Sequence, residues 1–229
     1  MKPRYFLFFT LALLFALPFG AQAQSSRGQK SDLVSISKID FKKLQKNDVQ
    51  RSNGQWIRIE VVLNATSDAE KKTSNNAQWI RNVEVSLTLV YEDNKDSNKS
   101  NKEKIVMQET VKIFALEAGK ETPVVFYVPP EAYSIYGISK AEPFAWSVEL
   151  SVDGTKIPLS RTNYKSMLSR KIWGSGSNVA KVLENYQKLV ESSAKANKGV
   201  LLSMPKAPLP VQLYETYKGN SVMPTYVIE

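Results

Sequence analysis

The sequence predicts a mainly β protein built as an antiparallel β-sandwich, and three observations support this fold class. Several stretches alternate apolar and polar residues with a period of two, as half-buried strands do. Loops rather than helices separate these stretches. The pair Asp153-Gly154 ends one of them and is typical of a two-residue hairpin turn.

The strands can be placed in chain order. The alternation is clear in residues 57–63, 83–91 and 144–152, and weaker in residues 33–41, 105–114 and 122–128. A seventh strand, residues 155–160, follows from the hairpin turn. That turn places Val152 opposite Thr155 and makes apolar residues face each other at the next inward positions. Pro158 has no N–H to donate, so we expect this last strand at a sheet edge.

About seven short strands joined by loops are typical of an immunoglobulin-like β-sandwich. The chain has no cysteine, so it lacks the disulfide of antibody domains, and the hydrophobic core must stabilise the fold alone. The charged stretch 92–104 contains no apolar residue and is expected to form a mobile loop.

The pattern changes to a helical period after Ser160. Residues 164–172 indicate a short helix, and a longer amphipathic helix follows the Gly174-Ser175-Gly176 break. We expect Ser177 as its N-cap and Gly199 as its C-terminal stop. Its apolar stripe consists of Val179, Val182, Leu183, Tyr186, Leu189 and Val190.

The C-terminal tail is rich in proline. Pro205, Pro208 and Pro210 indicate an extended segment. The last residues, 225–229, have the composition of a strand that could add to the edge of a neighbour's sheet.

The N-terminus predicts a cleaved signal peptide. Lys2 and Arg4 precede an apolar run that is too short to span a bilayer, and Ala21-Gln22-Ala23 forms a small-x-small cleavage site. We therefore expect three regions: a signal peptide at 1–23, an immunoglobulin-like sandwich at 24–162, and a helical and Pro-rich appendage at 163–229. The exported protein is expected in the periplasm, at the outer membrane or on the cell surface.

The charge is basic. Loss of Lys2 and Arg4 lowers the net charge of +9 by two, to +7. An exported protein seldom meets nucleic acid, so such an excess would favour anionic lipid head groups, acidic glycans or an acidic protein. The lysines are scattered along the chain, which equally fits a role in solubility.

The residue types argue against an enzyme. Histidine and cysteine are both absent, which closes the Ser-His and Cys-His routes and the common zinc sites. The remaining Ser-x-x-Lys motifs lack the Lys-Thr-Gly companion of penicillin-recognising enzymes. We expect no catalytic residue, no metal and no cofactor.

The candidate functional residues are partner-binding ones. Tyr133 and Tyr136 are predicted in the loop that leads to the strand 144–152, where aromatic side chains either anchor a partner or close the end of the core. The stripe of the long helix either covers its own sandwich or docks on another chain. The complete set is Tyr133, Tyr136, Trp173, Val182, Tyr186 and Leu189.

The segments "WIRNVEVSLTLVYE" (residues 79–92) and "FYVPPEAY" (residues 126–133), with the late helix, carry a resemblance. The chain resembles immunoglobulin-like cell-envelope proteins encoded beside type IV pilus-like gene clusters of mucin-degrading Verrucomicrobia. The resemblance implies a non-catalytic structural or protein-interaction component of the cell surface, with protein partners from the envelope or the pilus machinery and possible homo-oligomers.

Two alternatives remain at this level. "VVFYVPPEA" (residues 124–132) is similar to the aromatic strand and double proline of periplasmic pilus chaperones, which would require a second β-domain after residue 160. A surface glycan-binding module would instead use Tyr133, Tyr136 and Trp173 as stacking rings.

Overall fold

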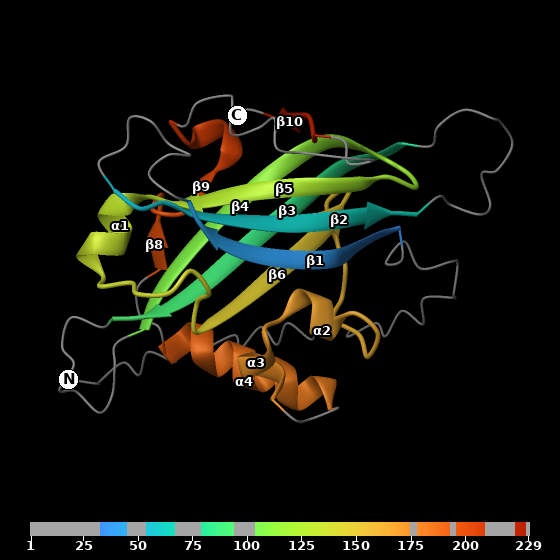
Figure 1. Cartoon of the computed structure of the whole chain (residues 1–229). Helices are drawn as coiled ribbons and strands as arrows, with labels where there is room; N and C mark the ends of the chain where they lie inside the picture. The colour runs from blue at the N-terminus through green and yellow to red at the C-terminus, as the bar shows by residue number, and fades with distance from the viewer. Residues whose placement is uncertain are drawn as a thin grey trace, which may run out of the picture.

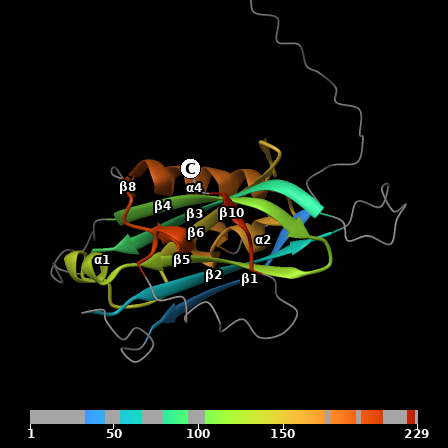
Figure 2. The same cartoon turned by 90° about the horizontal axis from the view of Figure 1, so that it is seen from above.

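The computed structural model describes residues 33–44, 54–66, 79–93, 104–174, 178–192, 196–208 and 223–227, with the side chains of 189–198 left out. Two antiparallel sheets pack face to face (Figure 1; Figure 2, seen from above). Sheet A has the order β1 (Val34–Lys43), β2 (Ile57–Ala65), β5 (Glu121–Val128), β9 (Leu202–Ser203). Sheet B has the order β10 (Tyr226–Val227), β4 (Lys104–Glu117), β3 (Trp79–Glu92), β6 (Ala145–Val152), β7 (Thr155–Lys156). A further short strand, β8 (Ala196–Lys198), runs parallel to β4.

The predicted immunoglobulin-like sandwich is confirmed. The first, second and fifth strands form one sheet, and the third, fourth, sixth and seventh form the other. The chain therefore crosses between the layers after β2, β4 and β5. All the predicted strands are present, and β3 and β4 extend beyond the predicted ranges to 14 residues each.

The hairpin around Asp153-Gly154 has the predicted turn. Both residues have positive φ, 50° and 72°, as a type I′ turn requires, and Val152 pairs with Thr155. The strand after it is shorter than predicted, because β7 ends at Lys156. It lies at the edge of sheet B, as Pro158 led us to expect. Asn82, also at positive φ, donates from Nδ2 to Asp153 Oδ1 at 2.9 Å and braces the turn.

The main core lies between the sheets. Inward-facing residues of both layers are almost completely buried, and the alternation along each strand sends their neighbours outward. The largest fully buried side chains of this core include Phe126, Ile57, Ile59, Leu63, Leu87, Leu89, Met107 and Leu150.

One α-helix was missed, and Pro205, predicted in an extended segment, lies instead in a short 3-10 helix, Met204–Lys206. The expected loop after β5 contains α1 (Pro130–Ile135), which begins with proline at its first position and Glu131 in its first turn. Six residues are too few for a helical period to appear in the sequence.

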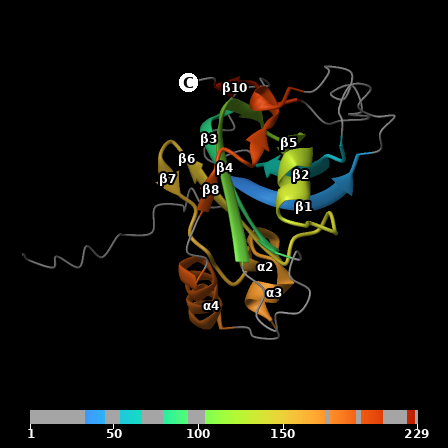
Figure 3. The same ribbon diagram turned by 90° about the vertical axis from the view of Figure 1, so that its left-hand side faces the viewer.

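The helices after Ser160 lie on one side of the sandwich (Figure 3). They are α2 (Tyr164–Met167), α3 (Arg170–Trp173) and α4 (Val179–Ser192). The expected N-cap Ser177 lies outside the described residues, and Asn178 Oδ1 accepts the Ala180 N–H at 3.0 Å at the start of α4. Gly199 was wrongly predicted as the stop of this helix: α4 ends at Ser192, and Gly199 lies in the turn after β8 with φ at 78°.

These helices cover the outer face of sheet B, and α2 also packs against β1 and contributes Met167 to the main core. A second apolar cluster forms on that outer face from strand and helix residues, namely Val90, Val106, Ala145, Tyr164, Leu168, Ile172 and Val182. The amphipathic helix thus packs on its own sandwich, which was one of the two predicted arrangements.

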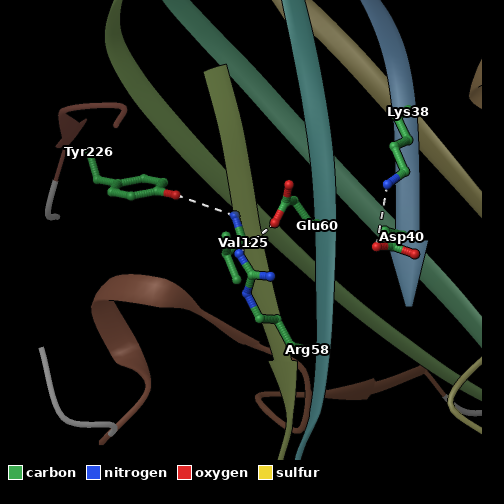
Figure 4. Close-up of polar contacts among 6 residues, drawn as sticks. All are labelled: Lys38, Asp40, Arg58, Glu60, Val125 and Tyr226. Atoms are coloured by element: carbon green, nitrogen blue, oxygen red, sulfur yellow. Dashed lines mark hydrogen bonds and ion pairs between the residues drawn. The ribbon is translucent and has the colours of Figure 1, made fainter. Parts of the chain in front are cut away.

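The last segments lie against the side of the sandwich formed by β4 and β5. β9 pairs with β5, β8 and β10 pair with β4, and the Tyr226 hydroxyl accepts the Val125 N–H at 3.4 Å (Figure 4). A third cluster forms beneath them on the outer face of sheet A, from Leu44, Trp56, Val125, Tyr127, Met204 and Ala207. The strand-like end of the chain therefore pairs with this chain's own sheet B.

The expected signal peptide, residues 1–23, lies outside the described residues. Within the part of the chain that the structure describes, no helix is long and apolar enough to cross a membrane.

Candidate functional site

The predicted tyrosines lie at the end of the sandwich that carries α1. Tyr133 lies in α1 and Tyr136 follows it, and both rings are half-buried against the main core. The Lys43 ammonium donates to the Tyr133 hydroxyl at 3.0 Å and to the Ser139 carbonyl at 2.8 Å. These contacts join β1 to the segment after α1, so the rings close this end of the core.

An open pocket of about 390 Å³ lies beside this end, lined by Tyr91, Glu92, Ile138, Ser139, Lys140, Glu142, Pro143 and Phe144. Burial raises the pKa of Tyr91 well above its usual value, and its hydroxyl donates to the Ala141 carbonyl at 2.8 Å. This phenol stays protonated and acts as a structural donor rather than a base. Glu92 is ion-paired with Lys104, so the pocket has no pair of free carboxylates suited to acid-base chemistry.

The other predicted residues belong to the helical side. Trp173 packs edge-on against Tyr164, with ring centroids 6.2 Å apart. Val182 is buried in the outer cluster, and the half-buried Tyr186 accepts a hydrogen bond from Ser147 Oγ at 2.9 Å. Leu189 lies in α4, but its side chain is outside the described set.

The structure does not bring the predicted residues together. Tyr133 and Tyr136 pack against the core between the sheets, whereas Trp173, Val182 and Tyr186 pack on the outer face of sheet B. No group of three or more acidic side chains in the described ranges is placed to hold a metal ion. The molecule therefore offers edges and faces for binding, and the two most distinctive ones were not predicted.

The first is the outer edge of β1, which has no second strand beside it among the described residues, although α2 packs against β1. Among the described strands, β1 has one neighbour, β2, whereas the β4 and β5 edges are partly covered by the C-terminal strands. The Leu44 N–H donates to the Trp56 carbonyl at 2.9 Å, which marks a hydrogen-bonded pair in the β1–β2 register. Pairs alternate along an antiparallel ladder, so the N–H and C=O groups of Ile39, Phe41 and Lys43 point away from β2.

The outer face of this edge strand is charged. Asp40 and Lys42 are exposed and alternate with the inward residues, and Lys38 lies 3.5 Å from Asp40 (Figure 4). A bulge between Ile36 and Lys38 interrupts the ladder, leaving residues 39–43 as its regular part. The Lys-x-Asp-x-Lys spacing was visible in the sequence, but not that it lies on a sheet edge.

The second feature is the distribution of charge. Six exposed cations lie between residues 161 and 188, with one carboxylate, Glu184; the cations are Arg161, Lys165, Arg170, Lys171, Lys181 and Lys188. The other described side chains are nearly balanced, with eleven cations against twelve acids. These are Lys38, Lys42, Lys43, Arg58, Arg81, Lys104, Lys112, Lys120, Lys140, Lys156 and Lys206 against Asp40, Glu60, Glu84, Glu92, Asp93, Glu109, Glu117, Glu121, Glu131, Glu142, Glu149 and Asp153.

No curated protein sequence matches this chain. A crystal structure of a protein from Akkermansia muciniphila, a Verrucomicrobium, shares the fold with a TM-score of 0.55. The two chains are 14% identical, and the alignment covers 86% of this chain and 93% of the other. A family model matches residues 21–219, and this chain therefore belongs to the family that the model describes.

Proposed function

We propose that this protein is a non-catalytic, exported component of the cell envelope that acts through protein contacts in a pilus-like surface assembly. The immunoglobulin-like fold, the family match and the fold shared with a Verrucomicrobial protein support this assignment. The observation that carries it is the outer edge of β1, because a row of backbone donors and acceptors with no second strand beside it is a template for strand addition. α2 packs against β1, so strand addition requires α2 to move aside.

The partner at this edge is a second copy of the chain. An antiparallel pairing of two β1 strands centred on Phe41 would make three hydrogen-bonded pairs, 41 with 41 and 39 with 43 twice. All of these residues have outward backbone groups. The contact is isologous, since the same segment faces itself across a two-fold axis.

The exposed charges select this register. With Phe41 at the axis, Asp40 of each copy lies opposite Lys42 of the other, in non-hydrogen-bonded pairs where side chains approach most closely. A shift by two residues would place Asp40 opposite Asp40 and Lys38 opposite Lys42. Like charges directly opposite are destabilising, so the sequence of β1 favours one pairing.

The alternatives have less support. A pilus chaperone needs a second β-domain, but the described residues after 160 form helices on sheet B and short strands in the existing sheets. A glycan module needs exposed stacking rings on one face. Tyr133 and Tyr136 are instead half-buried in a different cluster from Trp173.

The absence of cysteine allows a direct test by cross-linking. Purified Asp40→Cys and Lys42→Cys variants are mixed and oxidised. We expect a disulfide-linked heterodimer in excess over either homodimer, because only unlike positions face each other. A matched Lys181→Cys variant, at an exposed position on α4 on the outer face of sheet B, controls for random collision.

Charge variants give a second readout by sedimentation equilibrium. Asp40→Lys should weaken self-association, and the double variant Asp40→Lys/Lys42→Asp should restore it. Equal yields of all disulfide species, or no rescue, would refute the pairing. In cells, cross-links to many different pilus subunits would favour the chaperone, and retention on mucin lost with Tyr133→Ala/Tyr136→Ala would favour the glycan module.

A further inference from the structure

We propose that the helical layer, the described residues 161–188 on the outer face of sheet B, is a binding face for anionic phospholipid. The layer comprises α2, α3 and the described part of α4, which gather on one side of the sandwich (Figure 1; Figure 3). It carries the six exposed cations and a single carboxylate, whereas the rest of the described chain is nearly neutral. Among the described side chains, the basic excess therefore lies in the helical layer.

The cations of the helical layer are not used to hold the fold together. Lys188 pairs with Glu184 at 2.5 Å, but no carboxylate of the described residues lies within ion-pair distance of the other five cations. On the sandwich, several cations are paired with carboxylates, within one strand in Arg58–Glu60 and across strands or segments in Lys156–Glu149 and Lys206–Glu109. The positive charge of the layer is left to interact with something outside the chain.

Aromatic rings orient part of this charge. Lys165 lies 5.7 Å from the centroid of Trp173, and Lys171 lies 4.8 Å from that of Phe144. These contacts restrain the long side chains without neutralising them. Trp173 is half-buried among the lysines, and an indole with one apolar and one wet side is the kind of ring that settles at a membrane interface.

A surface rather than a small anion fits this arrangement. A phosphate or a carboxylate needs donors that converge, but the six cations are spread along residues 161–188, and none of them lines the pocket beside α1. A bilayer surface does not require donors that converge on one point, and each basic residue near such a surface strengthens binding about fivefold. The occupant is therefore the head-group layer of an anionic membrane.

The test is co-sedimentation of the purified protein with lipid vesicles at low ionic strength. Vesicles of phosphatidylcholine alone are compared with vesicles that contain about one third phosphatidylglycerol. We expect binding to the anionic vesicles only, and loss of binding as salt rises.

Two variants with equal loss of charge make the test specific. Removing three cations of the layer (Arg161→Gln, Arg170→Gln and Lys181→Gln) should lower the partition coefficient roughly 100-fold. Removing three cations of the sandwich (Lys120→Gln, Lys140→Gln and Lys156→Gln) should change it only slightly. Circular dichroism and thermal melts check that both variants fold.

The outcomes separate this proposal from others. Equal loss in the two variants would show that only net charge matters and would overturn a specific face. Binding to heparin without binding to anionic vesicles would overturn the lipid assignment in favour of an acidic polymer. The proposal is independent of the β1 contact, because the cysteine cross-linking is done without lipid and can fail or succeed separately.

Discussion

The sandwich and the helical layer differ in how they bury apolar side chains and in how they use charged ones. Between the sheets, apolar side chains are covered from both sides, and the charged residues on the outer faces are often paired. The helical layer covers an apolar cluster from one side only and leaves most of its cations without acidic partners. The sandwich thus uses its charges within the fold, whereas the layer presents them outward.

The largest expected difference is in the free energy of unfolding after substitutions in the main core and in the outer cluster of sheet B. Leu87 lies in the main core and Leu168 in the outer cluster, and both are fully buried. Leu87→Ala should lower the free energy of unfolding by about 3–5 kcal/mol, and Leu168→Ala by about 2–3 kcal/mol, because short helices relax into a cavity more easily than two paired sheets. Urea denaturation measures both, and an inverted order would contradict a dominant core between the sheets.

A smaller effect is expected from ion pairs. Lys206 holds Glu109 at 2.8 Å, and the Glu109 side chain is only 10% exposed. Lys206→Met should cost about 1–3 kcal/mol, since it leaves a nearly buried carboxylate without its partner.

The matched change in the helical layer is Lys188→Met, which removes an exposed pair. We expect no measurable change in the denaturation midpoint, because solvent screens such a pair. Equal destabilisation by the two substitutions would contradict the view that the layer's charges do not support the fold.

The smallest effect is one of pH. A hydrogen bond and the charge of Lys188 lower the pKa of Glu184 below its ordinary value. A lowered pKa contributes stability above the unfolded value, and this contribution is lost as the pH falls through the folded pKa. Carboxyl NMR titration should show a midpoint below that of a free glutamate, and Lys188→Met should raise it. An unchanged midpoint in the variant would rule out Lys188 as the cause.

Much of the fold could be predicted from the alternation of apolar residues and from turn residues in the sequence. The alternation in residues 57–63, 83–91 and 144–152 and the Asp153-Gly154 turn are local signals, and the structure confirms them. Elements of two or three residues, such as β8, β9 and β10, are too short to show a period. They form because a neighbouring edge supplies their hydrogen bonds.

The candidate site residues were harder to predict from the sequence. Tyr133 and Tyr136 attracted attention as aromatic residues near a double proline, but their burial depends on α1 and on Lys43, which is distant in sequence. Asp40 and Lys42 could not be predicted as interface residues, because alternating charge on a strand can pair with a second strand only if the first strand lies at an edge. Edge position depends on sheet order, which one sequence does not reveal.

The sequence by itself determined the fold class, most strand positions and the need to bury the long helix's apolar stripe, because each follows from the spacing of apolar residues over a few turns or strands. The tertiary structure decided where that stripe is buried, which strands lie at the edges of the sheets and which face carries the basic helices. The six cations of the helical layer are already grouped in the sequence between residues 161 and 188, and the fold places the helices that carry them against the sandwich. Such long-range placement depends on packing between distant segments, which local periodicity does not encode.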